Sequence, residues 1–179
     1  EYIDLGGGMG IQYEKKNKLF NYKKYNSIIK NFLKKHKVKI IFEPGRAIIA
    51  NSAVLFTQII YIKNTDKKKF IILDAAMNDF MRPALYGSFH NIIPLLKKNK
   101  KSKKIHDFVG PVCETTDRFL SLKGFQNLKE KEFLAISDVG AYGMSLSSNY
   151  NLRPKPSEIM VNKKSIKLIL KRQKLINFI

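Results

Sequence analysis

Residues 2–10 read YIDLGGGMG, and residues 38–46 read VKIIFEPGR. In each segment a short apolar run of strand character ends at a turn, made by three consecutive glycines in the first and by a Pro-Gly pair in the second. Between them, residues 22–36 carry apolar side chains at helical spacing with lysines in between, which predicts a helix. Strand, glycine turn, helix and strand in this order are typical of a βα unit in a parallel sheet or barrel.

The sequence changes character after about residue 53. Short β-branched or aromatic runs, separated by polar and Lys-rich connectors, predict an all-β part. These runs are residues 53–63, 69–74, 106–112, 132–136, 157–161 and 165–170. The predicted fold class is therefore α/β followed by all-β, with residues 1–52 in the first part and residues 53–179 in the second. Residues 47–50 are expected to form a short helix between them.

Composition narrows the class of protein. A chain of 179 residues with 44% hydrophobic residues is long and apolar enough to form a globular core. No apolar run approaches the roughly 20 residues that cross a bilayer. The single cysteine, Cys113, excludes an internal disulfide and a thiolate metal cluster, and it favours the reducing cytoplasm. Because the sequence opens with Glu1 directly in a strand-like run, we expect it to begin partway through a longer protein.

The net charge of +20 would by itself suggest nucleic acid or an anionic membrane surface as the partner. The basic residues are mostly lysines in runs such as residues 67–69 and 97–104, which are typical of solvated loops. Proteins that read bases favour Arg, and four of the five arginines here lie in or beside Gly- and Pro-marked motifs. We therefore expect neither nucleic acid nor membrane as a partner, and we keep a non-catalytic polyanion-binding β module as the alternative.

The two turns have the composition of an anion site. Consecutive glycines let backbone N–H groups converge on an anion, and phosphates bind at the carboxyl ends of parallel strands. The run Glu43-Pro44-Gly45-Arg46 holds a carboxylate and a guanidinium at fixed positions. If the two strands are neighbours, a phosphate fits between the turns with Arg46 close by. On these residues alone, ordinary tight turns with an incidental ion pair remain the alternative.

Five blocks along the sequence carry a more specific resemblance. They read DLGGGMGI at residues 4–11, EPGR at 43–46, MNDFMRPALY at 77–86, GPVCETTD at 110–117 and GAYGMS at 140–145, the last followed by NYN at 149–151. In order and rough spacing they resemble the diaminopimelate decarboxylases, a family of fold type III (alanine-racemase-like) pyridoxal-phosphate-dependent decarboxylases.

That resemblance has implications for fold and activity. It implies that residues 1–52 are the C-terminal end of a cofactor-binding (β/α)8 barrel, and that residues 53–179 are a C-terminal β-domain built as a barrel or sandwich. The implied activity is that of a carboxy-lyase, which converts meso-2,6-diaminopimelate to L-lysine and CO2 in lysine biosynthesis. A related decarboxylase for carboxynorspermidine, arginine or ornithine is the alternative within the superfamily.

The resemblance also implies where pyridoxal 5'-phosphate binds. The glycine run and the EPGR turn hold the phosphate, and in related decarboxylases the carboxylate matching Glu43 pairs with the pyridine nitrogen. A carboxylate there keeps the ring protonated, which strengthens it as an electron sink. The residues implied to contact the cofactor are Gly8, Glu43, Pro44, Gly45, Arg46 and Tyr142. The family's cofactor-linked lysine and its ring-stacking histidine belong to an earlier part of the barrel, so we expect both outside these residues.

Substrate choice follows from the chemistry of diaminopimelate, which carries an ammonium and a carboxylate at each end. The end that does not react must be held by a cation and an anion together. Arg46 and Arg82 suit the carboxylate, Tyr86 adds a hydroxyl, Glu114 can accept from the ammonium, and the family implies a further contact from Tyr142. Ornithine-type relatives recognise a bare amine, so the Arg82–Tyr86 block favours the diamino-dicarboxylate. For Tyr142, packing under a glycine turn is the alternative.

Cys113 is the expected proton donor. The carbon that loses CO2 must be protonated, and a thiol is mostly protonated at neutral pH and can deliver that proton. A buried structural cysteine is the alternative. In this family the Cys-Glu segment reaches the neighbouring subunit's site, which implies an obligate homodimer with shared active sites. The histidines at 36, 90 and 106 have no ligand spacing, so we expect them to be structural or exposed and predict no metal site.

Overall fold

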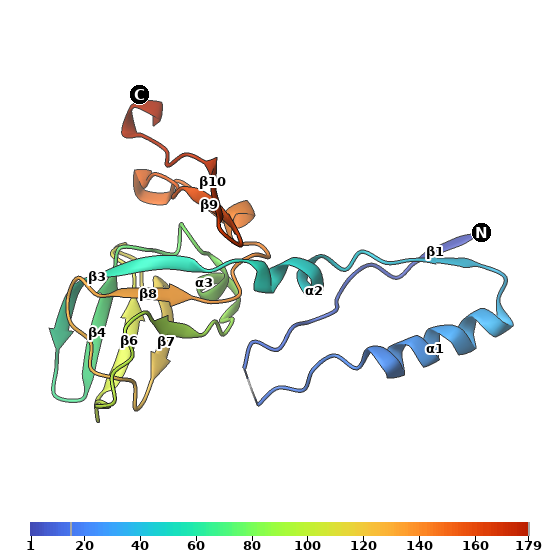
Figure 1. Ribbon diagram of the computed structural model, residues 1–179, viewed down its shortest axis with the longest axis horizontal. Coiled ribbons are helices and arrows are strands. Elements are labelled where there is room, and N and C mark those ends of the chain that lie inside the picture. Colours follow the sequence, from blue (N-terminus) through green and yellow to red (C-terminus); the bar gives the residue numbers. More distant parts are fainter. Residues whose placement is uncertain (15, 179) are drawn as a thin grey trace.

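The computed structural model describes residues 1–14 and 16–178, which form three sheets (Figure 1). A two-stranded sheet and a helix at the N-terminal end extend to one side of a six-stranded sheet, and a C-terminal hairpin lies above it in the view of Figure 1. The predicted order, α/β followed by all-β, is confirmed.

The N-terminal part is the predicted βα unit. Strand β1 (Tyr2–Asp4) pairs in parallel with β2 (Lys39–Ile41), and helix α1 (Tyr22–Lys35) is the crossover between them. The side chain of Asn21 caps α1 by accepting a hydrogen bond of 2.9 Å from the backbone N–H of Lys24. The two lysines in the last turn suit the negative end of the helix dipole.

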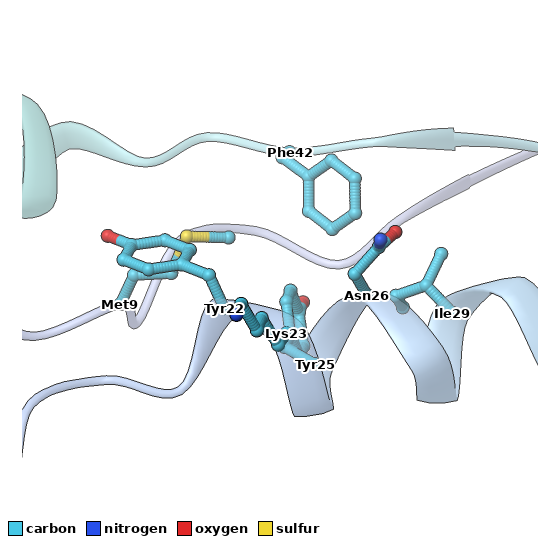
Figure 2. A pocket seen from close by; sticks show the side chains of 7 residues that line it. All are labelled: Met9, Tyr22, Lys23, Tyr25, Asn26, Ile29 and Phe42. Atoms are coloured by element: carbon cyan, nitrogen blue, oxygen red, sulfur yellow. The ribbon is translucent and has the colours of Figure 1, made fainter.

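Helix α1 packs loosely against the strands. No residue of α1, whose whole span the structure describes, is buried. Between α1 and the chain around β2 lies a groove of about 470 Å³, into which Met9, Tyr25, Ile29 and Phe42 project (Figure 2). The rings of Tyr25 and Phe42 meet edge to face at 5.9 Å. The face of α1 that carries Tyr25 and Ile29 is therefore only partly covered by the described residues.

Two short helical segments connect the βα unit to the large sheet. They are α2 (Gly45–Ile49) and the 3-10 turn η1 (Ala50–Ser52), close to the short helix predicted at residues 47–50. Ala50 is buried, and its carbonyl accepts a hydrogen bond of 3.0 Å from the N–H of Gly140. A side chain at Gly140 would collide with the carbonyl oxygen of Ile49. The loop after the last strand of the large sheet is thereby held tightly against this connection.

The large sheet has the strand order β5-β8-β3-β4-β6-β7, and all its pairs are antiparallel except β4 with β6. Its strands are β3 (Leu55–Asn64), β4 (Lys68–Leu73), β5 (Ile92–Pro94), β6 (Ile105–Val109), β7 (Arg118–Leu122) and β8 (Phe133–Ile136). The first half of β3 pairs with β8 and the second half with β4, with an irregularity between Ile59 and Tyr61. Such a bulge bends a strand and increases its twist, which curls the sheet.

One apolar core lies within the curl of this sheet. Most of its fully buried aliphatic and aromatic members come from the central strands, and Phe80 joins them from the segment before the next helix. The members from the strands are Ile59, Ile71, Leu73, Phe108, Leu134 and Ile136. Helix α3 (Arg82–Tyr86) packs beside β7 and ends at Gly87, which has the left-handed φ of 59° common in helix C-caps.

The chain finishes outside the large sheet. The 3-10 turns η2 (Met144–Leu146) and η3 (Tyr150–Leu152) lead to the antiparallel hairpin of β9 (Glu158–Asn162) and β10 (Ser165–Leu170), and η4 (Leu175–Phe178) follows. Among the described residues, no helix has both the length and the apolar character needed to span a bilayer.

Adjacent residues of β3 test this account of the core. Ile59 is fully buried, whereas its neighbour Ile60, at the irregularity of the strand, is 48% exposed. Ile59→Ala removes core contacts and should lower the free energy of unfolding by about 2–5 kcal/mol. Ile60→Ala, the matched control, should lower it by about 1 kcal/mol or less. Urea denaturation of both variants measures the difference, and equal losses would contradict this account.

Candidate functional site

The two turns that follow β1 and β2 lie side by side. The N–H of Leu5 donates to the carbonyl of Ile41 at 3.1 Å, and the N–H of Glu43 donates to the carbonyl of Gly6 at 2.8 Å. The turns approach so closely that a side chain at Gly7 would collide with the Glu43 carbonyl oxygen. The parallel pairing of two short strands thus brings residues 6–8 and 43–46 to one corner of the molecule.

Glycine is required in this corner for its conformation as well as for space. Gly6 and Gly8 have φ values of 63° and 73°, a region that L side chains rarely adopt. Apart from the adjoining backbone, no heavy atom of the described residues lies within 4 Å of the position that a Cβ would take at Gly8 or at Gly45. A small group can therefore come close to the backbone here without meeting a side chain of these residues.

Arg46 and Arg82 converge on one aromatic ring beside this corner. The guanidinium carbon of Arg46, in α2, lies 5.8 Å from the ring centroid of Tyr142, and that of Arg82, in α3, lies 5.6 Å from it. Cations favour the face of an aromatic ring at such distances. Three segments remote in the sequence meet at this ring, and two of them bring a positive charge.

The backbone of Tyr142 is constrained to make this contact. Its φ is 62°, which is unusual for a bulky residue, and its side chain is 43% exposed. A side chain at Gly143 would collide with the carbonyl oxygen of Val139, so the turn is closely packed on that side. Strained backbone of this kind is found where the surrounding structure fixes a functional side chain.

Arg82 is the more buried of the two cations, with only 5% of its surface exposed. Three tyrosine rings surround its guanidinium, at 5.7 Å for Tyr13, 5.6 Å for Tyr86 and 5.6 Å for Tyr142. Within residues 1–14 and 16–178, no carboxylate forms an ion pair with it. A buried charge without a counter-ion is costly, so this guanidinium is suited to bind an anion.

Two buried polar atoms near Arg82 and Tyr142 have no hydrogen-bond partner among the described residues. They are the Nε of Arg46 and the hydroxyl of Tyr13. Buried polar groups in proteins are nearly always paired, so each such atom needs an explanation. Arg46 contacts the ring of Tyr142, and Tyr13 contacts Arg82 and the ring of His90, so both atoms belong to this group of residues.

The segment before α3 is anchored by Arg153. Its Nε donates to the side-chain oxygen of Asn78 at 2.9 Å, and an Nη donates to the carbonyl of Asp74 at 2.6 Å. Asn78 is fully buried, and its own carbonyl accepts from the N–H of Ser148 at 2.9 Å. These contacts fix the start of α3, from which Arg82 projects.

Cys113 and Glu114 lie in the loop between β6 and β7. Cys113 is exposed, and Glu114 accepts at 3.3 Å from both the hydroxyl of Thr115 and the N–H of Thr116. The buried carboxylate of Asp117 braces the loop by accepting from the backbone N–H groups of Met77 at 2.7 Å and Val112 at 2.8 Å. Burial raises the pKa of the Asp117 carboxyl, and these hydrogen bonds partly oppose the rise.

The comparisons with known proteins identify the family. The model of the C-terminal sheet domain of the pyridoxal-dependent decarboxylases matches residues 13–140. The chain belongs to this family.

Its similar relatives in the decarboxylase family include several diaminopimelate decarboxylases. That of Aquifex aeolicus is 44% identical over 174 residues, which cover 97% of this chain and 41% of the relative. The crystal structure of the Helicobacter pylori diaminopimelate decarboxylase complexed with L-lysine is 41% identical, has a TM-score of 0.87, and is matched over 98% of this chain and 43% of that one. The structure of the M. jannaschii diaminopimelate decarboxylase in co-complex with L-lysine is 36% identical and has a TM-score of 0.90. The match covers 99% of this chain and 42% of that one. The chain thus spans about two fifths of the length of these decarboxylases.

Not all of the residues singled out from the sequence come together. The structure gathers the glycine corner, Arg46, Arg82, Tyr86 and Tyr142. Among the described residues, no hydrogen bond, ion pair or ring contact links Cys113 or Glu114 to that group. Two further residues lie in the group but were not predicted from the sequence as site residues, and they are Tyr13 and His90. His90 was expected to be structural or exposed, and it is buried. No motif or spacing marks them, because their contact joins a loop of the βα unit to the β-domain.

The buried His90 should make the stability of the protein depend on pH. Burial lowers the pKa of this side chain from 6.5 to about 4, so the unfolded chain takes up the proton at a higher pH than the folded chain does. The free energy of unfolding therefore falls as the pH drops from 6.5 towards 4, and this effect is absent above that window.

His90→Gln removes this titration. Between pH 6.5 and 5 we expect the wild type to lose about 1–2 kcal/mol more stability than the variant. Burial also lowers the pKa of His106, but that residue is present in both proteins and cancels in the comparison. Urea denaturation at a series of pH values measures the two slopes, and identical slopes would contradict the assignment of a neutral buried His90.

Proposed function

We propose that the protein carrying this chain is a diaminopimelate decarboxylase, which converts meso-2,6-diaminopimelate to L-lysine and CO2 with pyridoxal 5'-phosphate. The observation that carries the proposal is the pair of guanidinium groups on the ring of Tyr142, next to the glycine corner. Relatives that carry this name are 38–44% identical to the chain over nearly its whole length, which supports the same assignment. A cytoplasmic location is part of the proposal and suits a chain with one exposed free cysteine.

The glycine corner fits the phosphate of the cofactor. The open space at Gly8 and Gly45 leaves room for it, and the buried, unpartnered Nε of Arg46 is a donor suited to one of its oxygens. In this proposal Gly8 and the turn from Glu43 through Pro44 to Arg46 hold the phosphate, Tyr142 contacts the cofactor, and Glu43 partners the ring nitrogen. When bound, pyridoxal phosphate supplies an electron sink for the pair left by the departing carbon dioxide.

Arg82 and Tyr86 are proposed to select the substrate through its distal end. Arg82 is a buried cation with three tyrosine rings around it and no carboxylate partner among the described residues. A substrate carboxylate would satisfy this charge, with Arg46, Tyr86 and Tyr142 adding contacts, and poor solvation strengthens such a pair. A substrate with a bare amine at that end would leave Arg82 unpaired, which disfavours ornithine-type chemistry.

Cys113 and Glu114 are proposed to act in the site of a second copy. Within the chain they have no link among the described residues to the Arg46–Arg82 group, and Cys113 is exposed at a loop that Asp117 braces. In a homodimer with shared sites, the Cys113 thiol would donate its proton to the substrate carbon that has lost CO2, and water would then reprotonate the thiolate. Glu114 would accept hydrogen bonds from the distal ammonium.

A steady-state assay of the holoenzyme that contains this chain tests the proposal. We expect L-lysine to form from meso-diaminopimelate. Cys113→Ser should lower kcat by about 10²–10⁴-fold, the usual contribution of a positioned proton donor, with a smaller effect on KM. Lys123→Gln, at an exposed turn after β7, is the control and should leave both constants unchanged.

Other outcomes would overturn the proposal in distinguishable ways. Decarboxylation of arginine, ornithine or carboxynorspermidine without lysine formation would assign a related enzyme. No decarboxylation, together with DNA binding that weakens steeply with salt and on removal of residues 97–104, would assign a polyanion-binding module. An undiminished kcat in Cys113→Ser would remove the thiol from the reaction.

A further inference from the structure

Arg82 owes its orientation to a residue that no motif of the sequence marked. We propose that His90 is a positioning residue, which holds the Arg82 guanidinium so that its two terminal nitrogens face the distal carboxylate of the substrate. Tyr13 takes part by fixing the His90 ring. This inference rests on the proposed function, in which Arg82 binds that carboxylate.

The hydrogen bonds of His90 define its tautomer. The residue is 1% exposed, and its Nδ1 lies 3.0 Å from the carbonyl oxygen of Ser137. A carbonyl oxygen only accepts, so Nδ1 carries the proton and Nε2 carries a lone pair. The Nε–H of Arg82 donates to that lone pair at 3.4 Å. One ring thereby connects the backbone after β8 to the guanidinium.

Aromatic contacts prevent this ring from turning. Phe80 meets it edge to face at 4.6 Å, and Tyr13 meets it edge to face at 4.9 Å. The ring of Tyr13 also lies 5.7 Å from the guanidinium carbon of Arg82. The segment after the glycine corner therefore touches both the arginine and the histidine that orients it.

The arrangement leaves the terminal nitrogens of Arg82 for a ligand. Its Nε is engaged with His90, and the rings of Tyr13, Tyr86 and Tyr142 lie around the group. Within residues 1–14 and 16–178, neither terminal nitrogen makes a hydrogen bond or an ion pair. Two parallel N–H groups on one edge of a guanidinium match the two oxygens of a carboxylate.

A neutral acceptor is required for this role. The pKa of His90 is lowered to about 4, because burial and the neighbouring positive charge of Arg82 lower it more than the Ser137 carbonyl and the Asp138 carboxylate raise it. Among the described residues, the Tyr13 phenol is a further titratable group in contact with the ring. An aspartate or glutamate at position 90 would also accept from Arg82, but it would neutralise the charge that the substrate needs. Neutral His90 orients the guanidinium and leaves its charge intact.

Two substitutions separate the functions of the ring nitrogens. His90→Gln keeps an acceptor near the place of Nε2 and can still bind Arg82. His90→Asn keeps a donor near the place of Nδ1 for Ser137 but is too short to reach Arg82. The comparison is made in the holoenzyme that contains this chain, by measuring inhibition by L-lysine and by 1,5-diaminopentane. L-Lysine has the distal carboxylate, and the diamine has the same carbon chain without one.

We expect His90→Asn to raise the inhibition constant of L-lysine about tenfold, the usual effect of losing one hydrogen bond to a charged group, and to leave that of the diamine unchanged. The KM for meso-diaminopimelate should rise together with the inhibition constant of L-lysine. His90→Gln should stay within about threefold of wild type. Should His90→Asn fail to fold, Tyr13→Leu, which removes the ring packed on His90 and Arg82, is compared in the same way and is expected to weaken lysine binding selectively.

Equal weakening of both inhibitors would assign His90 a merely structural role, and no weakening of either would remove it from the site. His90→Gln behaving like His90→Asn would also overturn the inference. Arg82→Gln, measured in parallel, separates this inference from the proposed function. If Arg82→Gln abolishes the preference for lysine over the diamine and His90→Asn does not, only the inference fails. If Arg82→Gln keeps the preference, the proposed role of Arg82 fails as well.

Discussion

The shared ring of Tyr142 is the contact on which the candidate site depends. Arg46 and Arg82 approach it from two different helices, so two like charges are held near each other in a partly buried place. Like charges held in this way repel, and an anion bound between them relieves the repulsion. The site is therefore arranged for anionic ligands, and the phosphate and carboxylate of the proposed cofactor and substrate satisfy this requirement.

The backbone sets this arrangement before any ligand binds. Glycine at position 7 lets the first two strand ends meet, and glycine at position 140 lets the loop after β8 approach α2. The left-handed conformation of Tyr142 then directs its ring to the two guanidinium groups. Preorganisation of this kind spares a ligand the cost of ordering the site. The close backbone approach at Gly140 and the side-chain contacts of Arg46 and Tyr13 thus connect the βα unit to the β-domain beside the site.

Much of this structure was predictable from local sequence. Period and turn chemistry predicted three groups of elements. The strands β1 and β2 end at Gly and Pro, helix α1 carries apolar residues at helical spacing, and the central strands of the large sheet are short apolar runs. Strands β5 and β7, which form the two edges of the large sheet, were not predicted. The first has only three residues and ends in Pro94, and the second includes the polar residues Arg118 and Ser121. Motifs singled out Arg82 and Tyr142. They did not reveal the contact of Tyr13 with His90, which depends on how two distant segments pack.

The central claim is that Arg46 and Arg82 act on one ligand through a common site. A double-mutant cycle tests it most directly, with Arg46→Gln, Arg82→Gln and the double variant of the holoenzyme compared by their affinity for L-lysine. If both residues contact one bound molecule, the loss in the double variant should differ from the sum of the single losses by about 0.5–3 kcal/mol. Losses that add to within about 0.5 kcal/mol would mean that the two cations act independently, and they would contradict the account.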